Sequence, residues 1–311
     1  MDSPQDILLG VGACGHSVPI ISRPSRALRL SGRWTLPGSL IVCSTPIGNM
    51  ADVSERLRSA LAEVDVVYAE DTRRTKHLLD HLGLEVPLRS YFVANEGERS
   101  AEIAARLSNG GSVAIVTDAG TPAISDPGYT AVRAALGAGA RVSVVPGPSA
   151  VTAALVASGL PSDRFVFEGF LPRRGTARTE RMKALGEEER TIVLFSTKVR
   201  LLRDLRDLSR YLGRGRQCAV ARELTKIHEE VWRGDLDAAI VEWSAREPRG
   251  EFTLVMAGRQ APNPDLGLAL SECMEMIADG ATTSAAVRSV AARSGVNRRE
   301  LYEAVVKARA S

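Results

Sequence analysis

The chain has 311 residues, of which 44% are hydrophobic, and carries 40 Lys and Arg against 37 Asp and Glu, a net charge of only +3. This length suits two domains plus an appendage, each with a real core. The near balance of charge excludes affinity for nucleic acid over the whole surface, so any such contact must be confined to patches.

The four cysteines, Cys14, Cys43, Cys218 and Cys273, lie far apart and form no C-x-x-C pair, which fits a reducing compartment. No apolar run reaches the length of a membrane span, and the amino end lacks the charged start and apolar stretch of a signal peptide. We therefore expect a soluble, cytoplasmic protein that has no membrane partner.

Residues 1–37 precede the first clear element, and we expect either a disordered extension or a start codon assigned too early. Residues 10–15 (GVGACG) fit the dinucleotide-binding fingerprint, but Pro19 and Pro24 follow where a helix would have to begin. No βαβ pattern surrounds them, so we interpret this match as chance.

Apolar runs and helical patterns alternate through the first half, which we assign to a domain at 38–160. The runs at 40–43, 64–69 and 142–145, and the one that ends at 116, each lead into a polar loop. Helical spacing occupies 53–63, 72–82, 99–108, 127–138 and 149–158. This alternation predicts a βαβ sheet with buried parallel strands.

The loop at 116–128 (VTDAGTPAISDPG) combines turn residues with ligand-binding groups. Asp118 can accept from ligand hydroxyls, Gly120 allows close backbone approach, and Pro122 fixes the turn. A plain strand-to-helix turn is the alternative, because Gly, Pro and Asp also serve bare turns. Loops at the carboxyl ends of parallel strands share one crevice, so all four polar loops can converge on one site.

A second α/β domain is expected at 161–260. It begins within residues 158–175, where glycine and proline residues interrupt regular structure. Predicted strands near 190–195, 217–222, 228–233 and 251–257 are separated by helical patterns at 199–212 and 235–244.

A helical tail at 264–311 follows, with helices at 266–279, 283–293 and 297–309. Its second turn resembles a helix-turn-helix bend. We expect it to contact nucleic acid through four arginines or to be a small capping bundle; the arginines are Arg288, Arg293, Arg298 and Arg299.

Two further patterns have competing interpretations. Residues 172–183 gather five basic residues against one acid, which predicts either RNA contact or a solvated, mobile linker. His77 and His81 are four apart on a predicted helix, as metal ligands can be, but no third ligand is evident. We expect an exposed helix face there and no metal site.

Several ordered motifs together resemble the tetrapyrrole-methylase superfamily. They are TPIGN at 45–49, AEDTR at 69–73, DAGTP at 118–122 with DPG at 126–128, and PGPSA at 146–150. A narrower resemblance, to the ribosomal RNA small subunit methyltransferase I family, rests on FEGFLP at 167–172, ARELTKIHEE at 221–230 and GEF at 250–252. The resemblance runs from about residue 38 to 258 and continues more weakly to the C-terminus.

The resemblance implies two α/β domains with a cofactor cleft between them, a homodimer, and a specific reaction. That reaction is S-adenosylmethionine-dependent methylation of a cytidine 2'-hydroxyl in the decoding region of 16S rRNA, free or in the small ribosomal subunit. Motif positions that match the family are the candidates for cofactor binding: Pro46, Asp118, Ala119, Gly120, Ser125, Asp126 and Pro148.

A ribose hydroxyl is a poor nucleophile until its proton is accepted, so an acid or lysine is expected nearby. The catalytic candidates in matching motifs are Glu70, Asp71, Glu96 and Lys226, each of which has a helix cap or a salt bridge as its alternative role. Arginine suits phosphate oxygens. The candidates for RNA binding are Arg73, Arg173, Arg174, Arg222, Arg298 and Arg299.

The chain departs from the family pattern at two places. An apolar approach, YFVA at 91–94, precedes Asn95 and Glu96 where the family is histidine-rich, and residues 195–200 (FSTKVR) lack a carboxylate and an imidazole of the family pattern. Two alternatives therefore stay open: a tetrapyrrole methylase that uses the same cofactor, and a catalytically silent nucleic-acid-binding protein.

Overall fold

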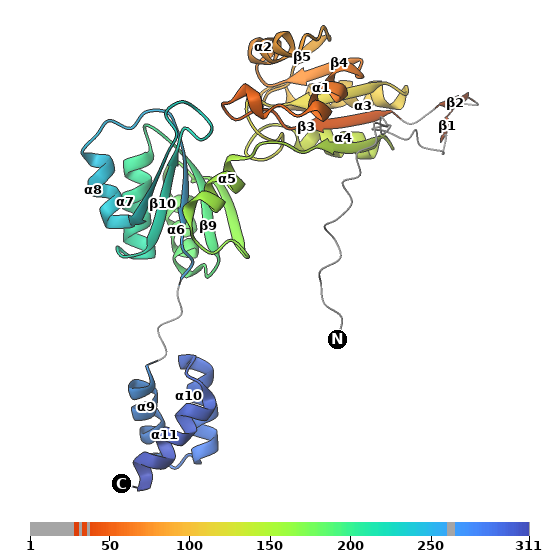
Figure 1. Cartoon of the computed structure of the whole chain (residues 1–311). Coiled ribbons are helices and arrows are strands. Elements are labelled where there is room, and N and C mark those ends of the chain that lie inside the picture. The colour runs from red at the N-terminus through yellow and green to blue at the C-terminus, as the bar shows by residue number, and fades with distance from the viewer. Residues whose placement is uncertain (1–27, 31–32, 36–37, 260–264, 311) are drawn as a thin grey trace, which may run out of the picture. The chain divides into compact units, whose positions relative to one another are not determined.

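The computed structural model describes residues 28–30, 33–35, 38–259 and 265–310, which form two α/β units and a helical tail (Figure 1). Two short strands near the amino end, β1 (Leu28–Leu30) and β2 (Arg33–Thr35), pair antiparallel. The rest of the expected extension at 1–37, including the fingerprint at 10–15, lies outside the described residues. The predicted fold class, two α/β sheets followed by helices, is confirmed.

The first unit contains a five-stranded sheet whose order is β5-β4-β6-β3-β7 and whose strand pairs are all parallel. Its strands are β3 (Ser39–Cys43), β4 (Val66–Ala69), β5 (Leu88–Ser90), β6 (Ser112–Val116) and β7 (Arg141–Val145). In register, Val116 at the end of β6 lies opposite both Cys43 and Ala69. The central strands therefore end at one level, and their polar loops leave from one edge of the sheet.

Helices cover both faces of this sheet, because the side chains of a strand alternate between its faces. Ile41 and Cys43 of β3 join one buried cluster, whereas Leu40 and Val42 join the other. The elements that connect the strands are η1 (Met50–Asp52), α1 (Glu55–Ala62), α2 (Thr72–Leu82), α3 (Glu96–Ser108) and α4 (Tyr129–Gly137). Burial on both faces explains why these strands appear in the sequence as continuous apolar runs.

The second unit contains a mixed five-stranded sheet of order β11-β10-β12-β9-β8, in which only β8 and β9 pair parallel. Its strands are β8 (Phe165–Phe170), β9 (Thr191–Thr197), β10 (Gln217–Arg222), β11 (Glu230–Asp235) and β12 (Glu251–Met256). Four of these strands match predicted ones. The sequence analysis missed β8, because proline and glycine at both ends of this segment looked like a domain junction.

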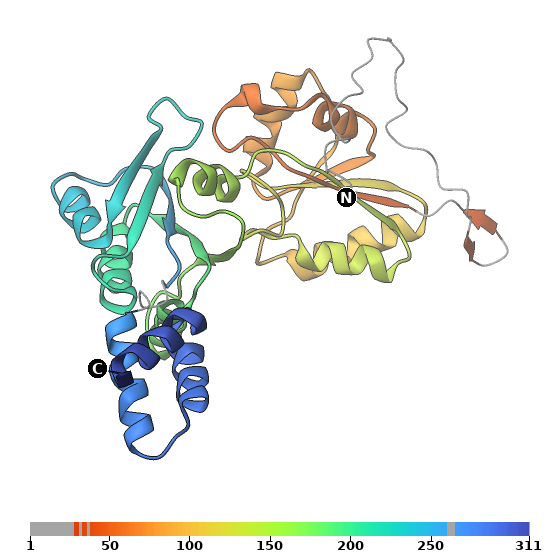
Figure 2. The same ribbon diagram turned by 60° about the horizontal axis from the view of Figure 1, so that its bottom comes forward.

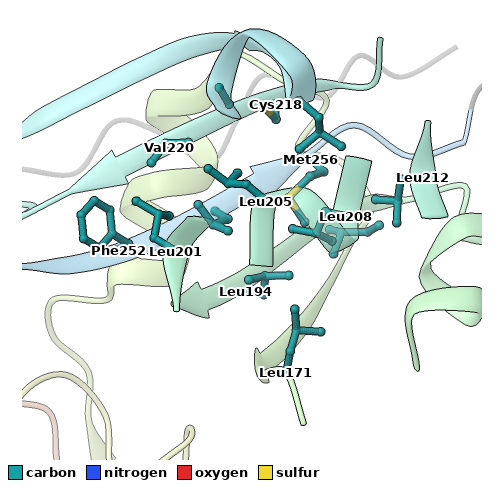
Figure 3. Packing of buried hydrophobic residues seen from close by; sticks show 14 of the residues in the cluster. Leu171, Leu194, Leu201, Leu205, Leu208, Leu212, Cys218, Val220, Phe252 and Met256 are labelled. Carbon is teal, nitrogen blue, oxygen red and sulfur yellow. The ribbon is translucent and has the colours of Figure 1, made fainter. Parts of the chain in front are cut away.

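One face of the second sheet packs on α7 (Leu201–Leu212), whose leucines Leu201, Leu205, Leu208 and Leu212 follow helical spacing. Figure 3 shows these leucines facing Leu194, Val220 and Met256, which project from the strands. The α6 (Thr176–Glu187) and α8 (Leu236–Ser244) helices add Met182 and Trp243 to the same core. Burying such side chains stabilises the fold by about 1.5–3 kcal/mol each.

Helix α5 (Ala150–Ser158) contacts strands β9, β10, β11 and β12 of the second sheet. By its contacts the chain divides after Gly147, with the short segment 47–49 grouped with the second unit. The domain boundary expected from the sequence, at residue 160, counted this helix with the first sheet.

The tail consists of α9 (Leu266–Ala278), α10 (Thr283–Ser294) and α11 (Arg298–Ala310), which pack side by side around a small core (Figure 2). Cys273, Val290 and Leu301 contribute one fully buried side chain from each helix. All three helices match predicted ones.

Two general expectations can be examined in the described part of the chain. No helix there is long and apolar enough to cross a membrane. The described cysteines, Cys43, Cys218 and Cys273, are buried and free. Burial raises the pKa of the Cys43 and Cys218 thiols to about 12, so both stay protonated at neutral pH.

Candidate active site at the carboxyl ends of the first sheet

Two neighbouring strand ends in the first unit are joined through side chains. Glu70 and Asp71 follow β4, and Thr117 and Asp118 follow β6. The Thr117 hydroxyl donates to Glu70 Oε2 at 2.7 Å, and the Asp71 amide donates to Asp118 Oδ1 at 3.0 Å. The predicted convergence of these two loops is therefore present in the structure.

The loop after β3 joins the same group. Thr45 and Gly120 exchange both backbone hydrogen bonds, at 2.9 and 3.1 Å, and the Thr45 hydroxyl donates to the Thr117 carbonyl at 3.0 Å. The hydroxyls of Ser44 and Thr121 lie 2.8 Å apart. These contacts fix the start of the 117–128 loop against the end of β3.

The middle of this loop has a strained backbone. Ala123 and Ser125 adopt φ values of 71° and 66°, in the left-handed region that residues with a Cβ rarely occupy, and Gly120 adopts 82° without that penalty. Each such non-glycine residue costs on the order of 1 kcal/mol and persists only where its surroundings enforce it. Strain of this kind concentrates at ligand-binding sites.

Three carboxylates, Glu70, Asp118 and Asp126, gather around Thr117. Burial, and then the charges of Glu70 and Asp118, raise the pKa of Asp126 to about 6, partly opposed by a hydrogen bond from Thr117. Burial and the Glu70 charge also raise the pKa of Asp118, although Arg74 lies 3.5 Å from its Oδ2. The group is rich in acceptors and poor in countercharge, so it suits a ligand that brings hydroxyl, amine or cationic groups.

Glu96 anchors the far end of the same loop. Its Oε1 accepts from the Gly128 amide at 3.1 Å and from the Tyr91 hydroxyl at 3.0 Å. Burial acts to raise the pKa of Glu96, but hydrogen bonds from Thr130, Gly128 and Tyr91 outweigh it, and the net pKa is lowered. Glu96 is thus an ionised acceptor that holds the start of α4.

Asp71 performs a local task. Its side chain accepts from the Arg73 amide at 2.8 Å, which caps α2, and pairs with the Arg73 guanidinium at 2.8 Å. These hydrogen bonds to Arg73 lower the pKa of Asp71. Asp71 therefore takes the helix-cap and salt-bridge role that was its alternative in the sequence, and Arg73 is its partner.

The remaining cofactor candidates flank these loops. Pro46 is buried directly after the Thr45–Gly120 bridge, and Ala119 is half-buried between Asp118 and Gly120. Pro148 follows Gly147, where an added Cβ would lie 2.9 Å from Ser44 Cβ. The loops after β3 and β7 thus approach each other closely, which explains glycine at 147.

Lys226 lies in the second unit, in a loop where its ammonium group is paired with two glutamates. Its Nζ is 2.9 Å from both Glu223 Oε1 and Glu251 Oε2. Burial acts to lower the pKa of Lys226, but the hydrogen bonds to Glu251 and Glu223 outweigh it and raise the net pKa. Glu223 and Thr225 adopt φ values of 49° and 67°, so this brace holds a strained loop.

The proposed RNA-binding arginines differ in how far they are engaged. Arg222 donates to the Arg249 carbonyl at 2.7 Å and lies 3.6 Å from Glu230, and Arg299 pairs with Glu303 at 3.0 Å. Arg173 and Arg174 are exposed, and the described residues offer them no ion pair, as is also true of Arg298 on α11.

One arginine of the basic segment at 172–183 is not on the surface. Arg178 is buried, and its guanidinium lies 2.8 Å from Asp204 and 2.7 Å from Asp207. The segment is also mostly helix α6 rather than a linker. The interpretation of this segment as a run of surface charge was therefore wrong at Arg178, because a sequence does not reveal a partner 26 residues away.

Comparison with known proteins agrees with the motifs. The model of the family Tetrapyrrole (Corrin/Porphyrin) Methylases matches residues 39–240. The chain is 46% identical over 275 residues to Ribosomal RNA small subunit methyltransferase I of Mycobacterium bovis, covering 88% of this chain and 96% of the relative. This chain belongs to the ribosomal RNA small subunit methyltransferase I family. A Thermotoga maritima member is 46% identical over 223 residues, which cover 72% of this chain and 100% of that relative.

Solved structures support the same fold for the methyltransferase I family. A diphthine synthase matches with a TM-score of 0.54 at 18% identity, over 70% of this chain and 89% of that chain. The cobalt precorrin-4 methyltransferase CbiF matches with a TM-score of 0.53 at 16% identity, over 71% and 94%. At these identities the likeness concerns the fold alone.

The methyltransferase I motifs predicted the loops of the site. They did not include two polar side chains whose hydrogen bonds fix those loops. Tyr91, in the approach that looked apolar, is buried, and its hydroxyl accepts from the Ala131 amide at 3.1 Å as well as contacting Glu96. Thr117 was missed although it stands next to Asp118. In both cases the residue with the hydroxyl directly follows a strand, β5 for Tyr91 and β6 for Thr117. Among the described residues no group of three or more His, Cys, Asp or Glu is placed to hold a metal ion.

Proposed function

We propose that this protein transfers a methyl group from S-adenosylmethionine to the ribose 2'-hydroxyl of a cytidine in the decoding region of 16S rRNA, cytidine 1402 in the usual rRNA numbering. One observation carries the proposal: relatives named Ribosomal RNA small subunit methyltransferase I are 46% identical over most of the chain. A porphyrin-type acceptor is the weaker candidate, since the solved tetrapyrrole methyltransferases are 16–20% identical.

The residues of the strand-end group fit the methyl donor. S-adenosylmethionine carries a sulfonium, an ammonium and ribose hydroxyls, and the carboxylates of Asp118 and Asp126 offer acceptors with little countercharge. A uroporphyrin-III C-methyl transferase of Thermus thermophilus with this fold was solved complexed with S-adenyl homocysteine. We propose that the donor is bound by the sequence-predicted set, Pro46, Asp118, Ala119, Gly120, Ser125, Asp126 and Pro148.

Methyl transfer from a sulfonium needs in-line approach, so most of the catalytic effect comes from positioning. A base near the ribose hydroxyl works best when its pKa lies near the working pH. Asp126 meets this condition, with a pKa raised to about 6, and Glu70 shares its hydrogen-bond partner Thr117. We therefore propose that Glu70 or Asp126 accepts the proton.

The other catalytic candidates suit supporting roles. The lowered pKa values of Asp71 and Glu96 make both weak bases, and both side chains already hold backbone amides. Lys226 has a raised pKa and is therefore protonated at neutral pH, which removes it as a base. We assign to Glu96 the positioning of the loop end and to Lys226 the bracing of its own loop.

The proposed substrate is 16S rRNA, free or in the small ribosomal subunit. Arg173 and Arg174 are the best placed phosphate ligands in the second unit, because both are exposed and the described residues give neither an ion pair. Arg222 and Arg73 must exchange existing partners to reach a phosphate. We also propose a cytoplasmic homodimer, which sedimentation of the purified protein tests.

The deciding experiment incubates the protein with labelled S-adenosylmethionine and either small subunits or naked 16S rRNA from cells that lack the enzyme, and then maps the label. The expected result is label on one cytidine ribose of the decoding region. Label on another nucleotide, or on a base, would overturn the specificity. No label from a protein that binds the donor in calorimetry would overturn rRNA as the acceptor, and no donor binding would favour a silent nucleic-acid-binding protein.

A further inference from the structure

The helical tail separates its charges between its helices. Residues 265–282, which include α9, contain four acids and no Lys or Arg, whereas residues 283–310, which form α10 and α11, contain six basic residues and two acids. The bundle is neutral in sum. Within it, α10 and α11 together carry a net charge of +4; Arg293 is paired with Glu272 of α9 at 2.7 Å, and the remaining positive charge attracts a polyanion.

Helix α11 presents a mixed stripe that flanks its core-facing side. Leu301 and Val305 are fully buried, whereas Arg298, Tyr302 and Val306, at a spacing of four residues, are exposed. Tyr302 exposes 45% of its surface and Val306 exposes 48%. Tyr302 thus offers an aromatic ring that is open to solvent, one helical turn from Arg298, to which the described residues give no ion pair.

The turn before α11 is short and fixed. Gly295 adopts φ 71° and ends α10, Val296 is buried, and the Asn297 side chain accepts from the Arg299 amide at 2.9 Å. These contacts set the direction of α11 relative to α10, as in the predicted helix-turn-helix bend. The exposed stripe is therefore displayed by a rigid support.

We propose that this face of α11, made of Arg298, Tyr302, Val306 and Arg309 and flanked by Arg299, is a docking surface for rRNA outside the methylated nucleotide. The choice of RNA as partner rests on the proposed function. Guanidinium groups bind phosphates, and an exposed tyrosine stacks on an unpaired base. The major groove of A-form RNA is too deep and narrow for a helix, so the partner is a loop or a single-stranded segment.

The surface lies outside the part of the chain that carries the proposed chemistry. The family match covers residues 39–240, and the Thermotoga maritima relative aligns over its whole length with 223 residues, fewer than the sheet units and the tail together. That relative is therefore too short to contain both sheet units and the tail. Changes on α11 are expected to alter RNA affinity and leave donor binding intact.

The test measures binding of the full-length protein to fluorescent fragments of 16S rRNA that contain the decoding region, by anisotropy at several salt concentrations. Arg298→Ala should weaken binding about threefold to tenfold and reduce the salt slope by about one. Tyr302→Ala should weaken binding about tenfold with the salt slope unchanged. Leu268→Ala, which removes an exposed apolar side chain from the acidic α9, is the control and should have no effect.

Calorimetry with S-adenosylmethionine and a melting curve accompany each variant, so that misfolding is recognised. Weaker RNA binding by the α11 variants supports the surface even if the protein methylates nothing, because this measurement does not depend on turnover. Unchanged RNA binding by both variants overturns the surface, even if methylation is normal. Loss confined to assembled subunits, with naked rRNA bound normally, also overturns it and assigns the face to a ribosomal protein.

Discussion

The two sheet units differ in whether their buried carboxylates are paired with a cation. In the second unit, Arg178 lies within 2.8 Å of both Asp204 and Asp207, and Asp204 also accepts from the Ser196 hydroxyl at 2.6 Å. In the first unit, the carboxylates of Asp118 and Asp126 have few positive neighbours and raised pKa values. A buried ion pair is structural, because removing one partner leaves an uncompensated charge. Carboxylates that are grouped without a nearby cation instead indicate a binding or catalytic site.

The same contrast separates the two strained loops. The loop with Glu223 and Thr225 at positive φ is braced by Lys226, which satisfies two glutamates. The loop with Ala123 and Ser125 at positive φ is fixed at its ends by Gly120 and Gly128, and its carboxylate faces other carboxylates. Strain alone therefore does not identify the site; strain together with unbalanced charge does.

The largest effect is expected from Arg178→Met. The change leaves the fully buried Asp204 carboxylate with only the more distant guanidinium of Arg200, 3.7 Å away, so the free energy of unfolding should fall by about 3–5 kcal/mol. Urea unfolding followed by the fluorescence of Trp243, which lies in the same core, measures it. Arg203→Met, which removes an exposed guanidinium 3.9 Å from Asp207, is the control and should cost less than about 1 kcal/mol. Equal losses from the two variants would refute the contrast.

Asp118→Ala should affect binding rather than stability. Losing a charge-assisted hydrogen bond to the donor, worth about 1.5–3 kcal/mol, should weaken S-adenosylmethionine affinity by roughly 10–100-fold in calorimetry. Stability should change little, because the variant loses both the cost of burying this acid, which raises the pKa of Asp118, and the hydrogen bond that it accepts from the Asp71 amide. Asp80→Ala, on the surface of α2, controls for the loss of an acid. Unchanged affinity in a folded Asp118 variant would remove this residue from the site.

Asp126→Asn probes the pH dependence of the site. Because the folded pKa, about 6, is above the ordinary value of 3.8, the folded state binds the proton more tightly; the stabilising contribution of Asp126 is present in full below pH 4 and is lost as pH rises through 6. The Asn variant lacks this loss, so it should gain about 1 kcal/mol over the natural protein at pH 8 relative to pH 4, after allowance for partial solvent exposure.

The same variant tests the proton acceptor. If Asp126 is the base, the rate of methyl transfer by the natural protein should fall below pH 6 and the variant should lose most of its activity at every pH. If Glu70 accepts the proton, Asp126→Asn should keep a substantial rate while Glu70→Gln abolishes it. Loss of neither rate would exclude both acids.

The smallest effect is expected from Lys226→Met. Lys226 braces Glu223 and the exposed Glu251, so its removal should cost about 0.5–1 kcal/mol in urea unfolding and change the rate of methyl transfer less than twofold. Its pKa is raised above 10.5, so no pH dependence should arise from it between pH 6 and 9. A rate loss of a hundredfold or more without loss of stability would instead make Lys226 a substrate ligand.

The sequence predicted the elements of the first unit well, because strands buried on both faces appear as uninterrupted apolar runs between strong turn signals. It missed β5 and β8, which are both edge strands. The β5 strand has only three residues, with Leu88 and Ser90 half-buried, and β8 (FVFEGF) is apolar but exposes Phe165 and Phe170 and lies among the proline and glycine signals of the domain junction. Edge strands are specified by their pairing partners, which a local pattern does not contain.

For the site, the sequence predicted which loops form it but not the role of each side chain. Motif spacing gave Glu70 and Asp118 together, and their strands do end side by side. It did not distinguish Asp71 and Glu96, whose carboxylates are engaged with backbone amides, from Asp126, whose carboxylate is not. That difference depends on three-dimensional hydrogen bonding and on burial, which one sequence does not record.

The 117–128 loop is tied at both ends, to Thr45 through Gly120 and to Glu96 through Gly128. Only the residues between these ties can adjust when a ligand arrives, so binding should order few rotatable bonds and lose little conformational entropy. In hydrogen exchange, the amides of Gly120 and Gly128 should be slow and that of Ser125 fast. Such a loop acts as a preformed binding surface and does not close over its ligand as a lid does.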